Sequence, residues 1–394
     1  MLFCKSAEKR LKPHIVLVAV PLEKGASGIG VYIMKMVEHL SRFDDIRLTV
    51  LGFADERHLL DIGASAEFVE IPRRYSSLAA NLLWHSTVLP LLCMRLGADV
   101  LFLPAGNRRM SIAPPLVGYK VAATVHDLAQ FHLPQKYDRL RTFYVTKVLP
   151  ALWRKTPKIV AVSHATAKDL AEITKVEKNK ISVVWNGVEH EQYYPMPKKE
   201  ARERIPEEFN LPQKYMIYVS RIEHPGKNHV GLLRAYRMLL DKYPDLEQKL
   251  LFCGGMWNGG EVVLEEISRL GLDKSVHMAG FVKQDLLPYL YCAADLLVFP
   301  SLFEGFGIPV IEAMAVGVPV AVSNRASLPE IVGEAGLLFD PEDVGETAAA
   351  MEHGLFDGSF RKRAQKDGPE RSEMFSWRES AEKTLQALVS LIGQ

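Results

Sequence analysis

Short hydrophobic runs rich in β-branched residues alternate along this chain with longer segments of helical periodicity. The first run, residues 14–20, is followed by a glycine-bearing loop at 25–30 and then by a helical segment at 31–40. Parallel strands need a crossover of a dozen or more residues, usually a helix, whereas a two-residue turn can join antiparallel strands. The runs have the spacing of βα units, which predicts an α/β fold with mostly parallel sheets covered by helices on both faces.

The alternation is interrupted once, near the middle of the chain. Further strands are expected at 47–52, 67–71, 99–103, 120–125, 158–162 and 181–184, and then at 215–219, 249–252, 276–278, 296–299, 318–322 and 336–338. The segment 187–210 between these groups is polar and proline-containing, which predicts a linker with one short helix. We therefore expect an N-terminal domain at 1–190, a C-terminal domain at 191–375, and an amphipathic helix within 376–394 that packs back on the N-terminal domain.

The charge is nearly balanced, because 48 Lys and Arg residues face 47 Asp and Glu residues and leave a formal net charge of +1. Proteins that bind nucleic-acid phosphates are normally much more basic, so no nucleic-acid partner is expected. The four cysteines lie far apart, without the spacing of a zinc site, so no metal and no cofactor is expected.

Compartment and membrane topology are also suggested by the composition. Sparse cysteine usage fits a reducing, cytoplasmic compartment. Residues 1–13 are charged and lack the apolar segment of a signal peptide. No uninterrupted apolar run reaches the ~18 residues that a spanning helix needs, so a peripheral membrane contact is the most that is expected.

The most informative segment is 300–322, which leaves a buried strand, passes through a polar, glycine-rich loop and enters a helix. Gly305 and Gly307 let a ligand approach the backbone, and the N–H groups at the start of the helix favour an anion. Glu304 lies on the loop. Glu312 lies one turn into the helix in a largely apolar sequence, where a carboxylate needs a partner. Sugar or ribose hydroxyls are suitable partners, and a structural salt bridge is the alternative.

Two cations follow the strand expected at 215–219. Arg221 offers a planar fork of donors and Lys227 a point charge, a pair that can clamp a diphosphate. The chain has no two aspartates separated by one residue, which is the common way to hold a divalent cation on a sugar nucleotide. Positive side chains are then needed to neutralise a departing diphosphate, so we favour this role over a solvated basic loop.

Two more candidate positions follow strand ends in the N-terminal half. Gly28 and Gly30 come after the first strand, but Ile33 replaces the third glycine of a dinucleotide-binding fingerprint. The loop either lets the backbone approach a phosphate or makes a tight strand-to-helix turn. His126 and Asp127 follow a later strand, at the carboxyl edge where parallel sheets bind ligands. Asp127 can face an acceptor hydroxyl or cap a helix.

The segment 303–315 resembles the E-x7-E signature of retaining glycosyltransferases of family 4, which have the GT-B fold of two Rossmann-like domains facing across a cleft. The resemblance extends over most of the chain: SGIGVY at 27–32, TVHDL at 124–128, VSHATAKDL at 162–170, WNGVE at 185–189, VSRIEHPGKN at 219–228, GFV at 280–282, ADLLVFPS at 294–301 and PEIVGEAGLLFDPED at 329–343. It implies a metal-independent transfer of a hexose from a nucleotide-diphosphate sugar to a hydroxyl of a glycan or polyprenyl-linked acceptor.

Roles for single residues are also implied by this resemblance. Glu304 contacts donor-sugar hydroxyls, Glu312 the nucleotide ribose, and Val282 lies beside the base. The expected catalytic residues are His126, Arg221, Lys227 and Glu304; the expected nucleotide-sugar-binding residues are Gly28, Gly30, Val282, Gly305, Phe306, Gly307, Ile308 and Glu312; Asp127 is expected on the acceptor side.

The same motifs indicate which donor to expect and which other functions remain possible. GDP-mannose is expected first and a UDP-sugar second, because the context at 126–128 resembles family members that build mannose-containing polysaccharides. A non-hydrolysing nucleotide-sugar epimerase, another GT-B enzyme, and a non-catalytic sugar-nucleotide-binding protein remain as alternatives. The intact Arg221, Lys227, Glu304 and Glu312 argue against a non-catalytic protein.

Two segments of the N-terminal half bear on membrane contact. Basic and aromatic residues are interleaved with apolar ones at 136–155, which is typical of a segment on an anionic membrane surface. Helices that cover a sheet and extend their cations into solvent are the alternative. The apolar segment 78–96, which follows Arg73 and Arg74, is expected to pack on the sheet.

Overall fold

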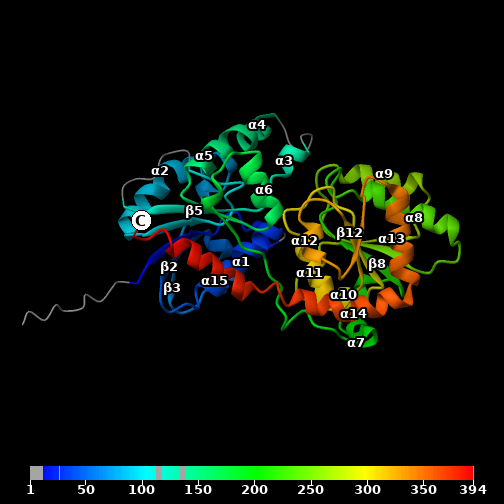
Figure 1. Cartoon of the computed structure of the whole chain (residues 1–394). Helices are drawn as coiled ribbons and strands as arrows, with labels where there is room; N and C mark the ends of the chain where they lie inside the picture. The colour runs from blue at the N-terminus through cyan, green and yellow to red at the C-terminus, as the bar shows by residue number, and fades with distance from the viewer. Residues whose placement is uncertain (1–11, 26, 112–117, 134–138, 394) are drawn as a thin grey trace, which may run out of the picture.

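The computed structural model describes residues 12–25, 27–111, 118–133 and 139–393, so the expectation about a targeting sequence at 1–13 lies almost entirely outside the described residues. Two parallel sheets form two Rossmann-like domains, one after the other along the chain (Figure 1). The strand order is β3-β2-β1-β4-β5-β6-β7 in the first sheet and β10-β9-β8-β11-β12-β13 in the second. The predicted α/β fold with two parallel-sheet domains is confirmed.

Each strand expected from the sequence is present, with its ends shifted by no more than two residues. The N-terminal sheet consists of β1 (His14–Val18), β2 (Arg47–Gly52), β3 (Ala66–Glu70), β4 (Val100–Leu103), β5 (Lys120–Val125), β6 (Lys158–Ala161) and β7 (Ile181–Val183). The C-terminal sheet consists of β8 (Tyr215–Val219), β9 (Lys249–Cys253), β10 (Val276–Gly280), β11 (Leu296–Phe299), β12 (Val320–Ser323) and β13 (Leu337–Phe339).

Helices connect the strands. Those of the N-terminal half and the linker are α1 (Gly28–Leu40), α2 (Leu78–Leu96), α3 (Ala129–His132), α4 (Arg139–Phe143), α5 (Leu149–Lys155), α6 (His164–Glu172) and α7 (Lys198–Glu203). Those of the C-terminal half are α8 (His229–Lys242), α9 (Gly260–Arg269), α10 (Leu287–Ala293), α11 (Ile308–Ala315), α12 (Leu328–Val332), α13 (Val344–Phe356), α14 (Gly358–Ser372) and α15 (Trp377–Val389).

Strand β1 shows why both faces of the N-terminal sheet are covered. All five of its side chains are buried, and successive side chains of a strand point to opposite faces. Ile15 and Leu17 join the hydrophobic cluster made with α1 and α15. Val16 and Val18 join the cluster on the other face, made with α2 and α5.

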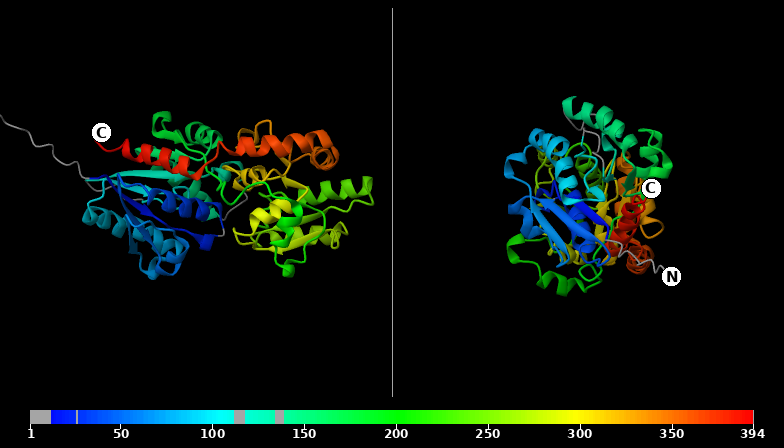
Figure 2. Two further views of the ribbon diagram at one scale, coloured as in Figure 1. Left: turned by 90° about the horizontal axis from the view of Figure 1, so that it is seen from below. Right: turned by 90° about the vertical axis from the view of Figure 1, so that its left-hand side faces the viewer.

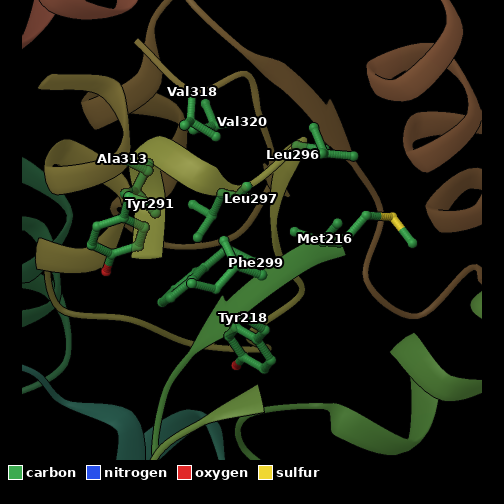
Figure 3. Close-up of a cluster of buried hydrophobic side chains, with 14 of the residues drawn as sticks. Met216, Tyr218, Tyr291, Leu296, Leu297, Phe299, Ala313, Val318 and Val320 are labelled. Atoms are coloured by element: carbon green, nitrogen blue, oxygen red, sulfur yellow. The ribbon is translucent and has the colours of Figure 1, made fainter. Parts of the chain in front are cut away.

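The core of the C-terminal domain lies directly behind the loops that carry the expected site residues. Tyr218 of β8, Phe299 of β11 and Tyr291 of α10 lie together in this core (Figure 3). Two tyrosine hydroxyls bond to site elements, because Tyr218 Oη donates to the Lys227 carbonyl (2.8 Å) and Tyr291 Oη donates to Glu312 (3.0 Å). The packed core therefore fixes the backbone and side chains of the site.

The chain crosses between the domains twice, and the two crossings touch. Val188 N donates to the carbonyl of Phe375 (3.1 Å). A Cβ on Gly187 would lie 2.0 Å from the Trp377 backbone nitrogen, so only glycine fits here. After the second crossing, α15 packs on the N-terminal half against α1 (Figure 2).

Candidate active site in the interdomain cleft

A cleft of ≈ 280 Å³ opens between the two domains, where the loops that follow the carboxyl ends of the strands meet. In open α/β sheets this edge is the usual place for a ligand. The lining includes every residue that the sequence predicted for the site except Gly30: Gly28, His126, Asp127, Arg221, Lys227, Val282, Glu304, Gly305, Phe306, Gly307, Ile308 and Glu312. The structure thus brings residues that follow five different strands to one surface.

Lys227 and Glu304 form an ion pair on the floor of the cleft. The Lys227 Nζ donates to Glu304 Oε1 over 2.6 Å, and both side chains are mostly buried. The pair joins the loop after β8 to the loop after β11, two adjacent strands of the C-terminal sheet. An anion bound in the cleft can therefore contact the Lys227 ammonium group while that group remains paired with the Glu304 carboxylate.

Arg221 lies at the border of the cleft. Its Nη2 is 3.3 Å from Glu223 Oε2, and its guanidinium carbon is 4.8 Å from the centre of the Trp257 ring. The segment around Arg221 is held by His229, which is fully buried and whose ring nitrogens lie 3.3 Å from Ser220 Oγ and from the Glu223 carbonyl. Burial lowers the pKa of His229 to about 3, so this histidine is a neutral structural support.

The glycine-rich loop between β11 and α11 is fixed from two sides. From behind, the Ser327 hydroxyl lies 2.9 Å from the Glu304 carbonyl and 3.0 Å from the Phe306 carbonyl. From the N-terminal domain, the His126 carbonyl comes so close that a Cβ on Gly305 would lie 1.8 Å from its oxygen. Gly307, with φ of 102°, supplies the left-handed residue that starts α11.

Glu312 lies at the back of the cleft, only 5% exposed, with Tyr291 as its hydrogen-bond donor. Burial raises the pKa of its carboxyl to about 7, despite the hydrogen bond from Tyr291 that favours the charged form. A buried carboxyl group that is close to ionisation at neutral pH can accept hydrogen bonds from ligand hydroxyls. The structural alternative of a salt bridge is not observed among the described residues around Glu312.

We predict that Glu312→Gln stabilises the protein at neutral pH. The native pKa of about 7 exceeds the unfolded value of 4.5, so the folded state holds the proton longer and wild-type stability falls as pH rises from 4.5 to 7. The full effect is at most about 3 kcal/mol. Glutamine still accepts from Tyr291 but does not ionise. Melting curves should show the variant above wild type at pH 8 and level with it at pH 5; equal curves at both pH values would contradict the raised pKa.

His126 and Asp127 contribute to the opposite wall of the cleft. His126 Nε2 donates to the Pro104 carbonyl (2.7 Å), which leaves Nδ1 without a proton, and burial lowers the pKa of the ring to about 4. This histidine is therefore a neutral group and not a cation of the site. Asp127 Oδ1 accepts from Ala129 N (3.1 Å) at the start of α3 while lining the cleft, so it caps the helix and also faces the ligand space.

The two glycines after β1 have different roles. A Cβ on Gly28 would lie 3.9 Å from Ile308 Cδ1, so Gly28 faces helix α11 across the cleft. A Cβ on Gly30 would lie 2.2 Å from the Leu22 carbonyl oxygen, which places Gly30 behind the cleft surface. For Gly30 the structure supports the tight strand-to-helix turn, in which the Ser27 hydroxyl accepts from Gly30 N (3.1 Å), in place of the expected ligand contact.

Several positioning residues escaped the sequence analysis. Ser327 and His229 hold the loops of the site in place through contacts with residues that no local motif reveals. Gly254 also lines the cleft and has its Cα against the Ser220 carbonyl, since a Cβ there would lie 1.9 Å from that oxygen. The Gly-Gly pair after β9 was a usable signal for Gly254. Arg108 lines the cleft as well, and its place after β4 gave only a weak signal.

A metal site was not expected. Among the described residues, the group with metal-ligand spacing is Glu38, His39 and Glu189, which lies outside the cleft. Lys35 Nζ already lies 2.9 Å from Glu38 and 3.0 Å from Glu189. These carboxylates therefore have an internal counter-ion.

Two parallel-sheet, Rossmann-like domains with a cleft between them are the architecture of the GT-B class of glycosyltransferases. The chain matches family models in both halves: "Glycosyltransferase Family 4" over residues 26–192 and "Glycosyl transferases group 1" over residues 199–371. It is 32% identical to O-antigen chain mannosyltransferase B of Escherichia coli over 268 residues, which cover 68% of this chain and 70% of that protein. This chain belongs to that family of glycosyltransferases.

Other relatives and solved structures agree with this assignment. A serotype-specific mannosyltransferase of Escherichia coli, WbdA, is 29% identical over 72% of this chain, and the match spans only 35% of that longer protein. Sucrose-phosphate synthase from Thermosynechococcus elongatus superimposes with a TM-score of 0.74 at 20% identity, covering 96% of this chain and 99% of that one. Anabaena HepE, solved with UDP and glucose, gives a TM-score of 0.73 at 18% identity over 96% of this chain and all of its own. These structures show the same fold.

Proposed function

We propose that this glycosyltransferase moves a hexose, with mannose first, from a nucleotide-diphosphate sugar to a hydroxyl of a glycan or polyprenyl-linked acceptor, with retention and without a metal ion. The observation that carries the proposal is the Lys227–Glu304 pair, which places an ammonium group and a carboxylate 2.6 Å apart beneath the glycine-rich loop. The diphosphate of a donor needs a positive group and its sugar hydroxyls need a hydrogen-bond acceptor, so a donor suits a site with both kinds of group side by side. In this proposal residues 1–190 bind the acceptor, residues 191–375 bind the donor, and residues 376–394 pack on the N-terminal domain.

In this mechanism the residues of the cleft stabilise separated charge. The acceptor hydroxyl attacks the anomeric carbon while the bond to the diphosphate breaks, so positive charge grows on the sugar and negative charge on the leaving group. Lys227, Arg221 and the N–H groups of the loop stabilise the leaving diphosphate. Glu304 holds the sugar hydroxyls. The leaving phosphate accepts the acceptor's proton, on the same face of the sugar.

The donor is proposed as GDP-mannose first and a UDP-sugar second. The relatives named as mannosyltransferases support the first choice. The solved neighbour in complex with UDP-glucose supports the second. In either case Val282 is placed beside the base and Glu312 at the ribose.

A panel of nucleotide sugars tests the function directly. At a free ligand concentration of 100 Kd, a donor that binds only the folded state should stabilise the protein by about 2.7 kcal/mol, seen as a higher melting temperature. GDP-mannose is expected to give the largest shift, followed by slow release of GDP without any added metal, also in the presence of EDTA. No shift with any nucleotide sugar would contradict the proposal.

The same panel separates the rival functions. An epimerase would convert the sugar of the nucleotide sugar with no acceptor present and release no nucleotide. A non-catalytic binding protein would give the thermal shift without release of nucleoside diphosphate. Release of nucleoside diphosphate that is accelerated by a glycan acceptor is expected only for a transferase.

A membrane contact is also proposed, on the outer face of α2. One face of α2 packs into the core through Trp84, Leu89 and Cys93, as expected. The other face differs from the expectation of an ordinary sheet-covering helix, because Leu83 and Leu91 are 60% and 62% exposed. Helices α5 and α4 lie on the same side of the domain (Figure 1), and α5 packs into the same cluster as α2. Residues 136–138 of the proposed segment 136–155 lie outside the described residues, and within the rest of the segment Phe143 is 61% exposed.

None of the described helices is both long enough and apolar enough to cross a bilayer. We propose instead that the α2 face rests on an anionic cytoplasmic membrane surface. We predict that a Leu83→Ser, Leu91→Ser double variant loses most of its sedimentation with liposomes containing anionic lipid at low salt. The matched variant Ile392→Ser, at an exposed position beyond α15, should sediment like wild type. If wild type stays in the supernatant, this part of the proposal is wrong.

A further inference from the structure

A second, smaller pocket of ≈ 90 Å³ opens beside the cleft, and its walls come from both domains. The N-terminal domain contributes Glu23, Arg108 and Arg141, and the C-terminal domain contributes Arg221, Glu223 and Trp257. Arg108 and Arg221 line the cleft as well, so the two spaces are contiguous. We call this space the arginine pocket.

The lining of the arginine pocket contains more guanidinium groups than carboxylates. Three guanidinium groups face two carboxylates: Arg108 pairs with Glu23, and Arg221 lies 3.3 Å from Glu223. A guanidinium group carries five N–H donors, so one carboxylate contact leaves donors for a further anion. An anion with several oxygens, such as phosphate, suits such forks.

Glu23 lies in the field of arginines from both domains. Burial works to raise the pKa of its carboxyl, but Arg108 next to it, together with Arg221, holds that pKa below the usual value. The backbone holds Glu23 in place at a cost, because Glu23 and Lys24 have φ of 51° and 53°, in the left-handed region that non-glycine residues rarely adopt. A negative group is therefore kept between the domains at this point.

Buried polar atoms without partners also occur outside the lining of the arginine pocket, on Arg109, which follows the lining residue Arg108, and on Tyr144. Among the described residues, Arg109 Nε and Tyr144 Oη are buried and have no hydrogen-bond partner. Burial, followed by the nearby charges of Arg108 and Arg141, lowers the pKa of Arg109, so cations are crowded behind the wall. Buried polar groups are nearly always satisfied, and a bound ion is one explanation for an exception. An anion bound in the arginine pocket would therefore reduce the repulsion between these positive groups.

Apart from Arg108 and Arg221, which line both spaces, the arginine pocket and the cleft have different lining residues. Lys227, Val282 and Glu304 line the cleft but not the arginine pocket, whereas Arg141, Glu223 and Trp257 line the arginine pocket but not the cleft. Trp257 is half exposed at the rim and offers an aromatic face of the kind that sugars stack on. A donor seated on Lys227 and Val282 leaves the arginine pocket for the second substrate.

We infer that the arginine pocket binds a phosphate group carried by the acceptor, so that the acceptor is a phosphorylated glycan, either a sugar phosphate or a glycan on a lipid phosphate. This inference rests on the proposed transferase function. It identifies Arg141 and Arg108 as acceptor-binding residues that a neutral acceptor would not need.

The first test is a binding experiment with inorganic phosphate. The protein is saturated with GDP, and separately with UDP, so that the donor site is filled, and phosphate is titrated by calorimetry. Wild type should bind phosphate saturably, and Arg141→Gln should weaken the affinity about tenfold or more, as expected for a charged hydrogen bond. The matched variant Arg378→Gln, at an exposed position on α15, should bind like wild type. Absent binding, or equal binding by Arg141→Gln, would overturn the inference.

The second test compares acceptors in transfer assays. Mannose 6-phosphate and mannosyl phosphofarnesol carry phosphate, and methyl mannoside does not. Arg141→Gln should raise the KM of the better phosphorylated acceptor about tenfold with an unchanged kcat, and leave the KM of methyl mannoside unchanged. Arg141→Lys, which keeps the charge, should retain part of the affinity. A preference for the first acceptor assigns the phosphate to a sugar, and for the second to a lipid carrier. If methyl mannoside is as good an acceptor as either, the inference fails.

Failure of this inference is distinguishable from failure of the proposed function. Donor hydrolysis without an acceptor needs only the cleft, so its rate in the wild-type protein tests the proposed function independently of the arginine pocket. A protein that hydrolyses its donor but ignores phosphate is a transferase with a neutral acceptor. A protein that hydrolyses no nucleotide sugar refutes the function itself.

Discussion

Lys227→Ala should lower kcat by about 10²–10³-fold, a loss of about 3 kcal/mol of transition-state stabilisation. The variant removes the ammonium group that we propose to contact the leaving diphosphate, and it leaves the Glu304 carboxylate without its 2.6 Å partner. Arg221→Ala should cost a similar amount. The measurement is single-turnover transfer with saturating donor. Lys366→Ala, at an exposed position on α14, is the matched control and should keep the wild-type rate.

Lys227 can act by binding the diphosphate directly or only by neutralising the Glu304 carboxylate, and measurements of GDP affinity distinguish these two roles. The affinity for GDP, which has no sugar, reports the diphosphate alone. If Lys227 binds the diphosphate, Lys227→Ala should weaken GDP binding both in the wild-type background and in the Glu304→Gln background. If the effect disappears in the Glu304→Gln background, Lys227 only neutralises the carboxylate. Wild-type turnover in both Lys227→Ala and Arg221→Ala would refute the assigned role of the two cations.

Gly305→Ala should lower transfer about 10²-fold while leaving GDP affinity within a few-fold of wild type. The added Cβ would lie 1.8 Å from the His126 carbonyl oxygen and 3.0 Å from Asp127 Cβ, so the loop and the N-terminal domain must move apart. A misplacement of about 1 Å between reacting groups costs about 100-fold in rate. We propose that the C-terminal domain holds the nucleotide, and on that proposal nucleotide binding should persist.

A matched glycine shows that the effect comes from the contact. Gly358 begins α14, and a Cβ added to it would have no neighbouring atom within 4 Å, so Gly358→Ala should be neutral or slightly stabilising. Two other contacts hold the domains together near the Gly305 loop, the stacking of His132 on Phe303 (4.4 Å) and the bond from His164 N to Glu330 (2.9 Å). Wild-type transfer by Gly305→Ala would mean that the close approach at His126 is not needed in the reacting state.

Much of the architecture was predictable because its causes are local or periodic. A buried parallel strand needs a run of apolar residues, and its crossover needs a helix, so strand after strand appears in the sequence at its observed place. The loop at 304–307 was equally readable. Glycines and a carboxylate in a strand-to-helix connection, followed by a proline and a second carboxylate early in the helix, are a local signal, and these residues do line the cleft.

Contacts between distant segments were decided only by the tertiary structure. Nothing near Gly305 in the sequence indicates that the His126 carbonyl approaches it, and nothing near Glu312 indicates that Tyr291 reaches it or that burial brings its pKa to neutrality. Gly30 was expected to bind the ligand, whereas the structure shows its Cα packed against the Leu22 carbonyl in the strand-to-helix turn. Exposed leucines on α2 and a pocket of arginines from both domains depend on which faces the packing leaves uncovered. The sequence alone determined which helices and strands form, because each carries its own hydrophobic pattern. Which side chains are buried, and which distant segments come into contact, was decided only by the tertiary structure, because both depend on how all the elements pack together.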